Sequence, residues 1–320
     1  MELKKVLLIG GSGFVGGWVA NRLTERGIRV IIPTRHRDHS RQLTMLPTVY
    51  TEDADVHDPQ VLAALMKGVD AVINLVGILH DRDSSEPYGK RFAAAHVGLP
   101  GKIIAAMQQA GVRRLLHMSA LRSAVDAPSA YLRSKAAGEA VVLGAAQELE
   151  VTVFRPSVIF GPGDSFLNTF ATLLRLFPVL PLGGGSARFQ PVYVGDVADA
   201  LASCLTDTAT FGQTYELCGP RVYSLRDLVD YTGKLIGKRR LVIDLPDALA
   251  YLQATFLSLL PKPPLSPDNL RSMQLDSLTD GQRNYPGWQP RSLEAVAPGY
   301  LSAVTPELRF DGYRSRAGRK

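Results

Sequence analysis

The sequence has 320 residues, of which 46% are hydrophobic and 21% charged, and its 36 Lys and Arg against 30 Asp and Glu give a net charge of +6. This is the composition of a globular protein with a sizeable core, and it excludes a disordered chain, a collagen and a coiled coil. The basic residues are not arranged in a stripe with interleaved aromatic residues, so we expect no nucleic-acid partner.

Apolar runs of strand length alternate with helical stretches along the N-terminal half. The runs are Val6–Ile9, Val30–Ile32, Val49–Tyr50, Ala71–Leu75, Leu115–Met118 and Val151–Phe154. Strands that are apolar throughout are buried on both faces, which requires helices above and below a parallel sheet. The pattern therefore predicts a doubly wound α/β fold.

A glycine-rich turn follows the first of these strands and precedes an apolar helix start. Its glycines are Gly10, Gly13 and Gly16. In such a turn the first glycine allows a tight bend, the second lets backbone N–H groups approach phosphates, and the third lets the helix pack on the strand. Because the strand, the helix and a second strand at Val30 are in the expected order, the turn predicts a dinucleotide site.

The pattern changes after Gly161. The expected elements are a helix over Phe166–Phe177, a strand near Gln190–Val194, a helix from Asp196 with Gly195-Asp196 as its N-cap, a strand over Thr214–Cys218, and a helix from Ser224 with Ser224 and Asp227 as its capping box. Since single cores stop growing at roughly 250–300 residues, two lobes are expected. We predict a Rossmann NAD(P)-binding domain over 1–165 with 189–218, a smaller C-terminal substrate-binding lobe over 166–188 with 219–306, and a basic flexible tail over 307–320.

The compartment is predicted from cysteine usage and from the chain start. Two cysteines, Cys204 and Cys218, do not form a disulfide framework and are typical of a reducing compartment. Residues 1–5 lead directly into the first strand, so no signal peptide is expected. We predict a cytoplasmic protein, with a position peripheral to the inner membrane as the alternative. No metal site is predicted.

With these motifs the chain resembles the short-chain dehydrogenase/reductase family of the extended or atypical type, over nearly its whole length. The matching stretches are Gly10–Gly16, Asp55–Asp58, Asn74–Gly77, Tyr131–Lys135 and Arg155–Gly163. The resemblance implies that a dinucleotide is held by the following residues: Gly10, Ser12, Gly13, Phe14, Val15, Gly16, Asp55, Val56, Leu75, Val76, Gly77, Lys135, Pro156 and Val158.

The end of the second strand bears on the choice of cofactor. NAD enzymes of this fold often carry an acidic residue here for the ribose 2′-hydroxyl, whereas this chain has Thr34-Arg35-His36-Arg37. Arginine pairs with a 2′-phosphate, which an acid repels. We therefore favour NADP(H) over NAD(H). The alternative is that Arg35 stacks on adenine or only solvates the surface.

Tyr131 and Lys135 are the candidate catalytic pair. They lie four residues apart in a segment of helix-forming residues, so both project from one face. An ammonium beside a phenol lowers the pKa of the phenol toward a range useful for proton transfer. The resemblance also implies that Lys135 holds the nicotinamide ribose.

Two positions depart from the family pattern. The serine or threonine that contacts the substrate carbonyl is expected where Ala120 stands, and Ser119 is the candidate replacement. The helix asparagine that relays protons aligns with His96. We interpret His96 and His117 as hydrogen-bonded structural histidines. The departures leave hydride transfer open.

Several stretches are most similar to bacterial relatives of the nucleotide-binding accessory subunit of respiratory complex I. They include Asn74–Leu79, Leu116–Leu121, Tyr131–Glu139, Gln190–Val194 and Thr214–Pro220. This resemblance implies a bound NADPH and a partner in a respiratory complex or at a membrane surface. Arg188 and Tyr193 are the candidate substrate residues, by analogy with related sugar-nucleotide enzymes.

Three functions follow from these residues. The first is an NADP(H)-dependent oxidoreductase acting on a lipophilic small molecule, a quinone or isoprenoid-type carbonyl compound. The second is a structural or assembly protein that carries NADPH without turnover. A nucleotide-sugar epimerase or dehydratase is the weaker alternative.

The segment Asp247–Leu260 is apolar on most faces, and it is too short for a bilayer span of roughly 20 residues. We interpret it as a core helix. The alternative is that this helix and the basic tail lie against a membrane, in which case removing the residues after Phe310 weakens liposome binding.

Overall fold

The computed structural model describes residues 3–35, 43–83, 85–261 and 263–302. Its centre is a seven-stranded parallel sheet in the order β3-β2-β1-β4-β5-β6-β11. The strands are β1 (Lys5–Ile9), β2 (Arg29–Thr34), β3 (Val49–Asp53), β4 (Ala71–Asn74), β5 (Arg114–Met118), β6 (Glu150–Pro156) and β11 (Gln213–Leu217). The strand order reverses between β1 and β4, which is the switch point of a doubly wound sheet.

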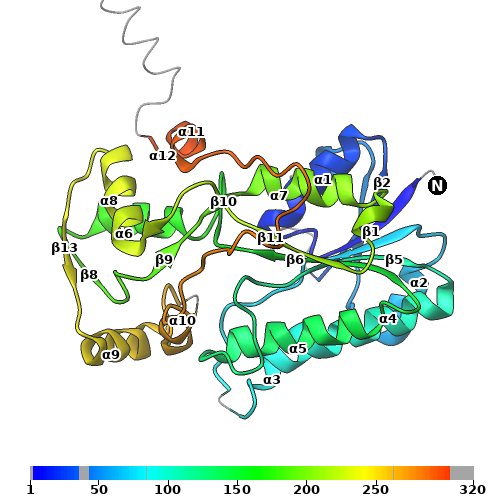
Figure 1. Ribbon diagram of the computed structural model, residues 1–320, viewed down its shortest axis with the longest axis horizontal. Helices are drawn as coiled ribbons and strands as arrows, with labels where there is room; N and C mark the ends of the chain where they lie inside the picture. Colours follow the sequence, from blue (N-terminus) through cyan, green and yellow to red (C-terminus); the bar gives the residue numbers. More distant parts are fainter. Residues whose placement is uncertain (1–2, 36–42, 84, 262, 303–320) are drawn as a thin grey trace, which may run out of the picture.

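Helices cover both faces of this sheet (Figure 1). One face packs against α1 (Phe14–Glu25) and α7 (Val194–Cys204). The other packs against α2 (Pro59–Leu65), α4 (Leu99–Ala110) and α5 (Ala130–Gly144). Buried valine, leucine and isoleucine side chains of the strands fill both layers, which confirms the predicted doubly wound α/β fold.

Short elements complete this part of the chain. They are α3 (Lys90–Phe92), the π-helical turn η2 (Ala93–Gly98), the 3-10 turn η3 (Thr208–Thr210) and β7 (Ile159–Phe160). The π-helical turn runs directly into α4 and packs on α5.

A smaller lobe lies beyond the carboxyl ends of the central strands, at the left of Figure 1. It contains α6 (Leu167–Leu176), β8 (Val179–Leu182), β9 (Arg188–Phe189), β10 (Val192–Tyr193), β12 (Tyr223–Ser224), α8 (Leu225–Leu235), β13 (Leu241–Asp244), α9 (Asp247–Leu257), α10 (Pro267–Ser272), α11 (Leu293–Val296) and α12 (Pro298–Leu301). Its core is formed by α6, α8 and the two-stranded pair β8–β13.

Several predicted boundaries differ from those observed. The expected strand near Gln190–Val194 is the two-residue β10, and α7 begins at Val194, so Asp196 lies inside its first turn. The capping box of Ser224 and Asp227 is present as predicted.

The C-terminal segment does not stay in the smaller lobe. Trp288 Nε1 donates a hydrogen bond to the carbonyl of Cys218, and Arg291 pairs with Asp196 at 2.7 Å. Tyr285 and Trp288 pack against the core beneath α1 and α7. The predicted smaller lobe included these residues, whereas they lie on the α7 side of the central sheet.

The prediction that Asp247–Leu260 is a core helix is wrong. Helix α9 ends at Leu257, and of its residues only Ala250 and Ala254 are buried. Leu252 and Phe256 are exposed. Among the described residues, no helix is both long enough and apolar enough to cross a bilayer.

Candidate dinucleotide and catalytic site

The glycine turn between β1 and α1 has the geometry that a phosphate cradle needs. Gly10 has φ +82°, and a Cβ there would lie 3.0 Å from the carbonyl carbon of Leu75 at the end of β4. A Cβ at Gly16 would lie 2.5 Å from the Gly10 carbonyl oxygen. The first glycine is therefore required by the turn and the last by the close packing of α1 on it.

Helix α1 begins with open backbone donors. Gly13 is its N-cap and supplies no side-chain hydrogen bond, so the first N–H groups of the helix have no side-chain cap. Gly13 is exposed, and Ser12, Phe14 and Val15 are half-buried around it. An uncapped N-terminus above a glycine turn fits a pyrophosphate.

The residues predicted to contact the adenosine half follow β2 and β3. Arg35 comes directly after β2 and is exposed, while His36 and Arg37 lie outside the described residues. Asp55 is exposed after β3 and accepts a hydrogen bond from the N–H of His57. Val56 packs partly against the core below. These positions leave Arg35 and Asp55 accessible at the carboxyl edge of the sheet.

Lys135 lies in the first half of α5 with its ammonium at the ends of β4 and β5. Nζ donates to the carbonyl of Met118 at 3.0 Å and to that of Val76 at 3.4 Å. A Cβ built on Gly77 would lie 3.2 Å from the same Nζ, so a larger residue here would crowd the ammonium. Burial lowers the pKa of Lys135 to about 8, although Glu139 acts in the opposite direction. The predicted ribose contact is thus close to Leu75–Gly77.

Tyr131 lies one turn before Lys135 and its ring is packed among aromatic groups. The ring is edge-on to His96 at 5.7 Å and to Phe92 at 6.1 Å. Burial raises the pKa of Tyr131 to about 12. Lys135 therefore does not lower the pKa of Tyr131 as predicted, because desolvation of the buried phenol raises it.

His96 is a partnered structural histidine, as the sequence analysis interpreted it. Its Nε2 accepts the N–H of Ile78 at 3.1 Å, so the proton is assigned to Nδ1, which lies 2.8 Å from Ser134 Oγ. Burial, with the charge of Lys135 next, lowers its pKa to about 2. The π-helical turn places this ring against α5, where a Cβ at Gly138 would meet the His96 carbonyl.

Ser119 closes β5 and is buried. Its Oγ lies 3.4 Å from Ser123 Oγ. Ser123 Oγ donates a hydrogen bond to the carboxylate of Glu139, which forms an ion pair with Arg155. Ala120, by contrast, clusters with Tyr131. The small residue therefore lies beside the tyrosine, and the hydroxyl of Ser119 is directed toward the Glu139 network.

His117 is the second buried histidine, one strand residue before Met118. Its Nδ1 lies 3.2 Å from Asn74 Nδ2, and its Nε2 has no hydrogen-bond partner among the described residues. Burial, together with Lys135, lowers its pKa to about 3. His117 is therefore neutral. We expected a hydrogen-bonded histidine, and this holds for Nδ1 but not for Nε2.

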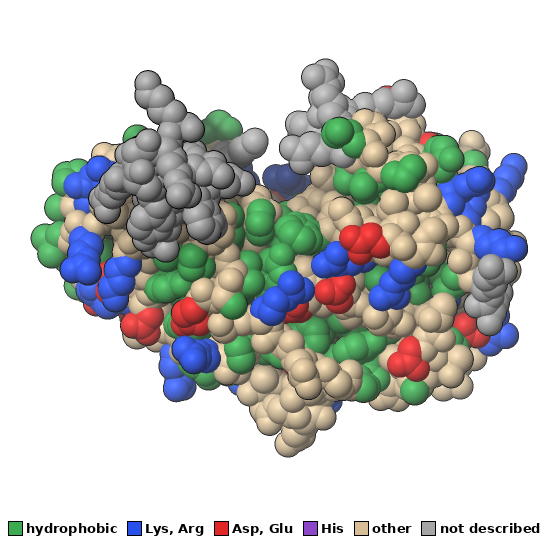
Figure 2. All heavy atoms as spheres, turned by 90° about the horizontal axis from the view of Figure 1, so that it is seen from above, with side chains coloured by type: hydrophobic (Ala, Val, Ile, Leu, Met, Phe, Trp, Pro, Cys, Tyr) green, Lys and Arg blue, Asp and Glu red, His purple; other side chains and the backbone are tan. Residues whose placement is uncertain are grey.

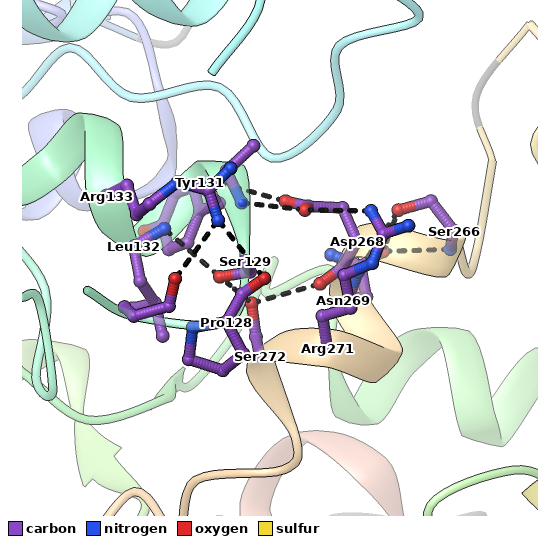
Figure 3. Close-up of polar contacts among 12 residues, drawn as sticks. Pro128, Ser129, Tyr131, Leu132, Arg133, Ser266, Asp268, Asn269, Arg271 and Ser272 are labelled. Atoms are coloured by element: carbon purple, nitrogen blue, oxygen red, sulfur yellow. Dashed lines mark hydrogen bonds and ion pairs between the residues drawn. The ribbon is translucent and has the colours of Figure 1, made fainter. Parts of the chain in front are cut away.

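An acid from the smaller lobe holds the first turn of α5, and sequence reasoning did not find it. Asp268 of α10 accepts hydrogen bonds from the backbone N–H of Ala130 at 2.8 Å and of Tyr131 at 3.0 Å (Figure 3). Ser272 donates to Ser129, the N-cap of α5, at 2.8 Å. Helix α5 is thus fastened to the smaller lobe at the residue that carries the phenol.

The remaining predicted residues lie near the ends of β6 and in the smaller lobe. Pro156 is buried and Val158 half-buried. Arg188 is exposed, but Asp276 pairs with it at 2.6 Å. Tyr193 is 7% exposed and packs on Trp18 and under Arg291, so its ring fills the core. Arg188 is thus partly neutralised, and Tyr193 has little open surface for a substrate.

Comparison with known protein families matches residues 6–218 to the NAD dependent epimerase/dehydratase family. The chain belongs to this family. The match begins at β1 and ends just after β11, so it covers the whole seven-stranded sheet with the glycine turn and the α5 pair.

Among curated proteins, this epimerase/dehydratase-family chain is similar to subunits of a respiratory enzyme. It is 32% identical over 283 residues to "NADH dehydrogenase [ubiquinone] 1 alpha subcomplex subunit 9, mitochondrial" of Arabidopsis thaliana, covering 85% of this chain and 69% of that protein. It is 34% identical over 231 residues to the subunit of that name from Mus musculus, covering 70% and 59%. The chain thus spans less than two thirds of the mouse protein. The resemblance predicted from sequence is confirmed.

Solved structures share the fold. The dTDP-glucose 4,6-dehydratase DesIV from Streptomyces venezuelae, solved with NAD bound, superposes with a TM-score of 0.73 at 20% identity, covering 98% of each chain. A structure named gox2253 gives a TM-score of 0.68 at 22% identity, covering 99% of this chain and all of the other. At these identities the likeness establishes the Rossmann-type fold.

Proposed function

We propose that the chain is an NADP(H)-dependent oxidoreductase that acts on a lipophilic carbonyl compound of the quinone or isoprenoid type. The observation that carries this is the placement of Tyr131 and Lys135 on one face of α5, with the Lys135 ammonium beside Gly77 at the edge where the glycine turn lies. When bound, the dinucleotide supplies or takes up a hydride.

In the proposed reduction Tyr131 is the proton donor. Since the pKa of Tyr131 is raised to about 12, the phenol is protonated at neutral pH and is suited to donate a proton to a carbonyl oxygen. Lys135 is suited to orient the nicotinamide ribose. In the proposal Ser119 polarises the carbonyl, which requires its hydroxyl to turn away from Ser123.

The proposed preference for NADP(H) rests on the end of β2. The strand ends at Thr34, a position where an acidic residue would repel a 2′-phosphate. The exposed Arg35 follows and can pair with that phosphate. Asp53 of β3 lies opposite Thr34, and Asp55, which follows β3, is proposed to contact adenine rather than the ribose.

A lipophilic substrate is supported by the smaller lobe and by one relative. In the smaller lobe the ring of Phe166 lies 5.4 Å from that of Phe170 and 6.0 Å from that of Phe189, beside the candidate substrate residue Arg188. A Mycobacterium tuberculosis protein named 3 beta-hydroxysteroid dehydrogenase/Delta 5-->4-isomerase is 27% identical over 244 residues, covering 67% of this chain and 64% of that protein. Steroids and isoprenoids are both large and apolar.

A second candidate function is that of an NADPH-carrying structural or assembly protein with a partner in a respiratory complex. It is favoured by Ala120, which stands where a serine or threonine is expected and clusters with Tyr131, and by His96, whose ring nitrogens are both engaged. The names of the similar Arabidopsis and mouse proteins agree with it. The proposed location in either case is the cytoplasm, with a position peripheral to the inner membrane as the alternative.

A nucleotide-sugar epimerase or dehydratase remains the weaker alternative. The solved relatives include MoeE5 in complex with UDP-glucose and NAD, at a TM-score of 0.65, 23% identity and coverage of 75% of this chain and 85% of that chain. Such a substrate needs a cation for its diphosphate, and Arg188 is paired with Asp276.

Turnover of the bound nicotinamide tests the proposal. Loss of reduced-nicotinamide absorbance is followed as quinones, isoprenoid aldehydes and sugar nucleotides are added to the full chain. We expect oxidation with the first two classes and loss of at least a hundredfold in rate for Tyr131→Phe, because the proton donor is removed. Tyr50→Phe, at an exposed tyrosine of β3, is the matched control. Equal rates for Tyr131→Phe and wild type would exclude the tyrosine as acid, and no oxidation by any class would favour the structural role.

A further inference from the structure

Helix α9 is apolar on two opposite faces. Ala250 and Ala254 are buried, and a Cβ at Gly183 would lie 2.8 Å from Ala250 Cβ, so this face is fitted closely to the smaller lobe. Leu252 and Phe256, one helical turn apart on the other side, are 53% and 65% exposed. Large apolar side chains exposed side by side normally mark a surface that something covers, so the outward face of α9 lacks the cover that its residues predict.

The outer face of the neighbouring two-stranded sheet is also apolar and exposed. In the parallel register of β8 and β13, Val179 lies opposite Leu241 and Pro181 opposite Ile243. Since side chains alternate along a strand, these residues share one face, and all of them are exposed. Gln253 Nε2 donates to the carbonyl of Pro181 and so joins α9 to β8. We name the outward residues Val179, Pro181, Leu241, Ile243, Leu252 and Phe256 the apolar edge.

A basic cluster borders the apolar edge. Lys234, Lys238, Arg239 and Arg240 line one shallow pocket between α8 and β13, with Asp230 as the acid among them. Among the described residues, neither Lys238 nor Arg239 forms an ion pair. Figure 2 shows Lys and Arg side chains beside hydrophobic ones at the left end of the molecule. The border is therefore net positive.

Acidic groups near the apolar edge do not cancel this charge. Asp244, at the end of β13, is paired with Arg226 at 2.9 Å. Asp247 lies in the first turn of α9, at the end of the helix away from Phe256. The part of the apolar edge next to Lys238, Arg239 and Arg240 thus keeps its positive charge.

We propose that the apolar edge docks on the surface of a bilayer that contains anionic lipid. Leu252 and Phe256 enter the boundary between headgroups and acyl chains, and Lys238 and Arg239 contact lipid phosphates. A compact apolar surface bordered by unpaired basic side chains is the pattern of a protein that lies in the membrane interface without spanning it. The inference rests on the proposed location at a membrane and is independent of the proposed reaction.

Vesicle flotation of the full chain tests the docking. The vesicles are phosphatidylcholine alone and phosphatidylcholine with phosphatidylglycerol. The apolar variant is Leu252→Gln with Phe256→Gln, and its control is Met45→Gln with Val125→Gln, two side chains that are 85% and 82% exposed on the Rossmann domain.

A second pair of variants tests the basic border. Lys238→Gln with Arg239→Gln is compared with Lys102→Gln and Arg113→Gln, which removes the same charge from exposed sites on the other lobe. Native mass spectrometry of each variant for bound dinucleotide checks its fold and scores the proposed function separately from flotation.

The proposal expects wild type and both controls to float with the anionic vesicles, at least tenfold more than with phosphatidylcholine alone. Each edge variant is expected to lose at least tenfold. Equal flotation of Leu252→Gln/Phe256→Gln and wild type, or no flotation of wild type, would overturn it. If wild type does not float but forms a dimer, and Leu252→Gln/Phe256→Gln dissociates that dimer, the apolar edge binds a second copy of the chain. That result would also overturn the proposal of bilayer docking.

Discussion

Replacing Asp268 by alanine removes the carboxylate that fastens the smaller lobe to the first turn of α5. Two hydrogen bonds are lost, from Ala130 N at 2.8 Å and Tyr131 N at 3.0 Å. Hydrogen bonds to charged groups contribute about 1.5–3 kcal/mol each, and a negative charge near a helix N-terminus adds about 0.3–1 kcal/mol.

The expected net loss is smaller than the sum. The Asp268 side chain is 15% exposed, so water can reach the freed N–H groups and offset part of the loss. We expect Asp268→Ala to lower the free energy of unfolding by about 2–3 kcal/mol and Asp268→Asn, which keeps one acceptor, by about 1 kcal/mol.

Urea unfolding followed by circular dichroism measures both changes as shifts of the midpoint at constant slope. Asp126→Ala is the matched control, because Asp126 is exposed on the loop before α5 and makes no hydrogen bond with another described residue. A loss below about 0.5 kcal/mol for Asp268→Ala, equal to that of the control, would refute the reasoning, since that is the range of ordinary surface substitutions.

Gly16→Ala is expected to weaken dinucleotide binding at least tenfold by calorimetry, because its Cβ would meet the Gly10 carbonyl oxygen, whereas Gly101→Ala, with open space around it, should bind like wild type. Arg35→Glu is expected to lower the ratio of NADPH to NADH affinity at least tenfold, and an unchanged ratio would exclude Arg35 from the 2′-phosphate site. Burial lowers the pKa of His117 to about 3, so the unfolded chain binds more protons between pH 6.5 and 3 and stability falls as pH falls through that window. His117→Gln should remove about one proton, or ~1.4 kcal/mol per pH unit, from that slope in acid unfolding, and an unchanged slope would show that His117 does not carry it.

The inner strands of the central sheet were predictable because they are almost entirely buried, and burial on both faces produces an apolar run. The glycine turn was predictable from its local pattern, since Gly16 is fixed by steric contact with Gly10 and Gly11, whereas the contact of Gly10 with Leu75 could not be seen in the sequence. Strands of two residues, such as β10, are too short for periodicity to identify.

Long-range partners set the limit for the site. The Ser-Pro-Asp-Asn run at 266–269 indicates a helix start, but nothing in the sequence shows that Asp268 reaches Tyr131 across 137 positions. The pKa of Tyr131 was predicted with the wrong sign because the sequence shows the spacing to Lys135 and not the burial of the phenol. Helix α9 was predicted as a core helix because its sequence is hydrophobic. Hydrophobicity shows that a helix face favours burial, but it does not show that another part of the same chain packs against that face.

Native mass spectrometry of the purified full chain tests most directly whether the glycine turn holds a dinucleotide of the proposed kind. The account predicts one NADP(H) per chain, absent from Gly16→Ala and retained by Gly101→Ala. NAD(H) in its place would contradict the proposed preference, and equal loading of Gly16→Ala would contradict the site itself.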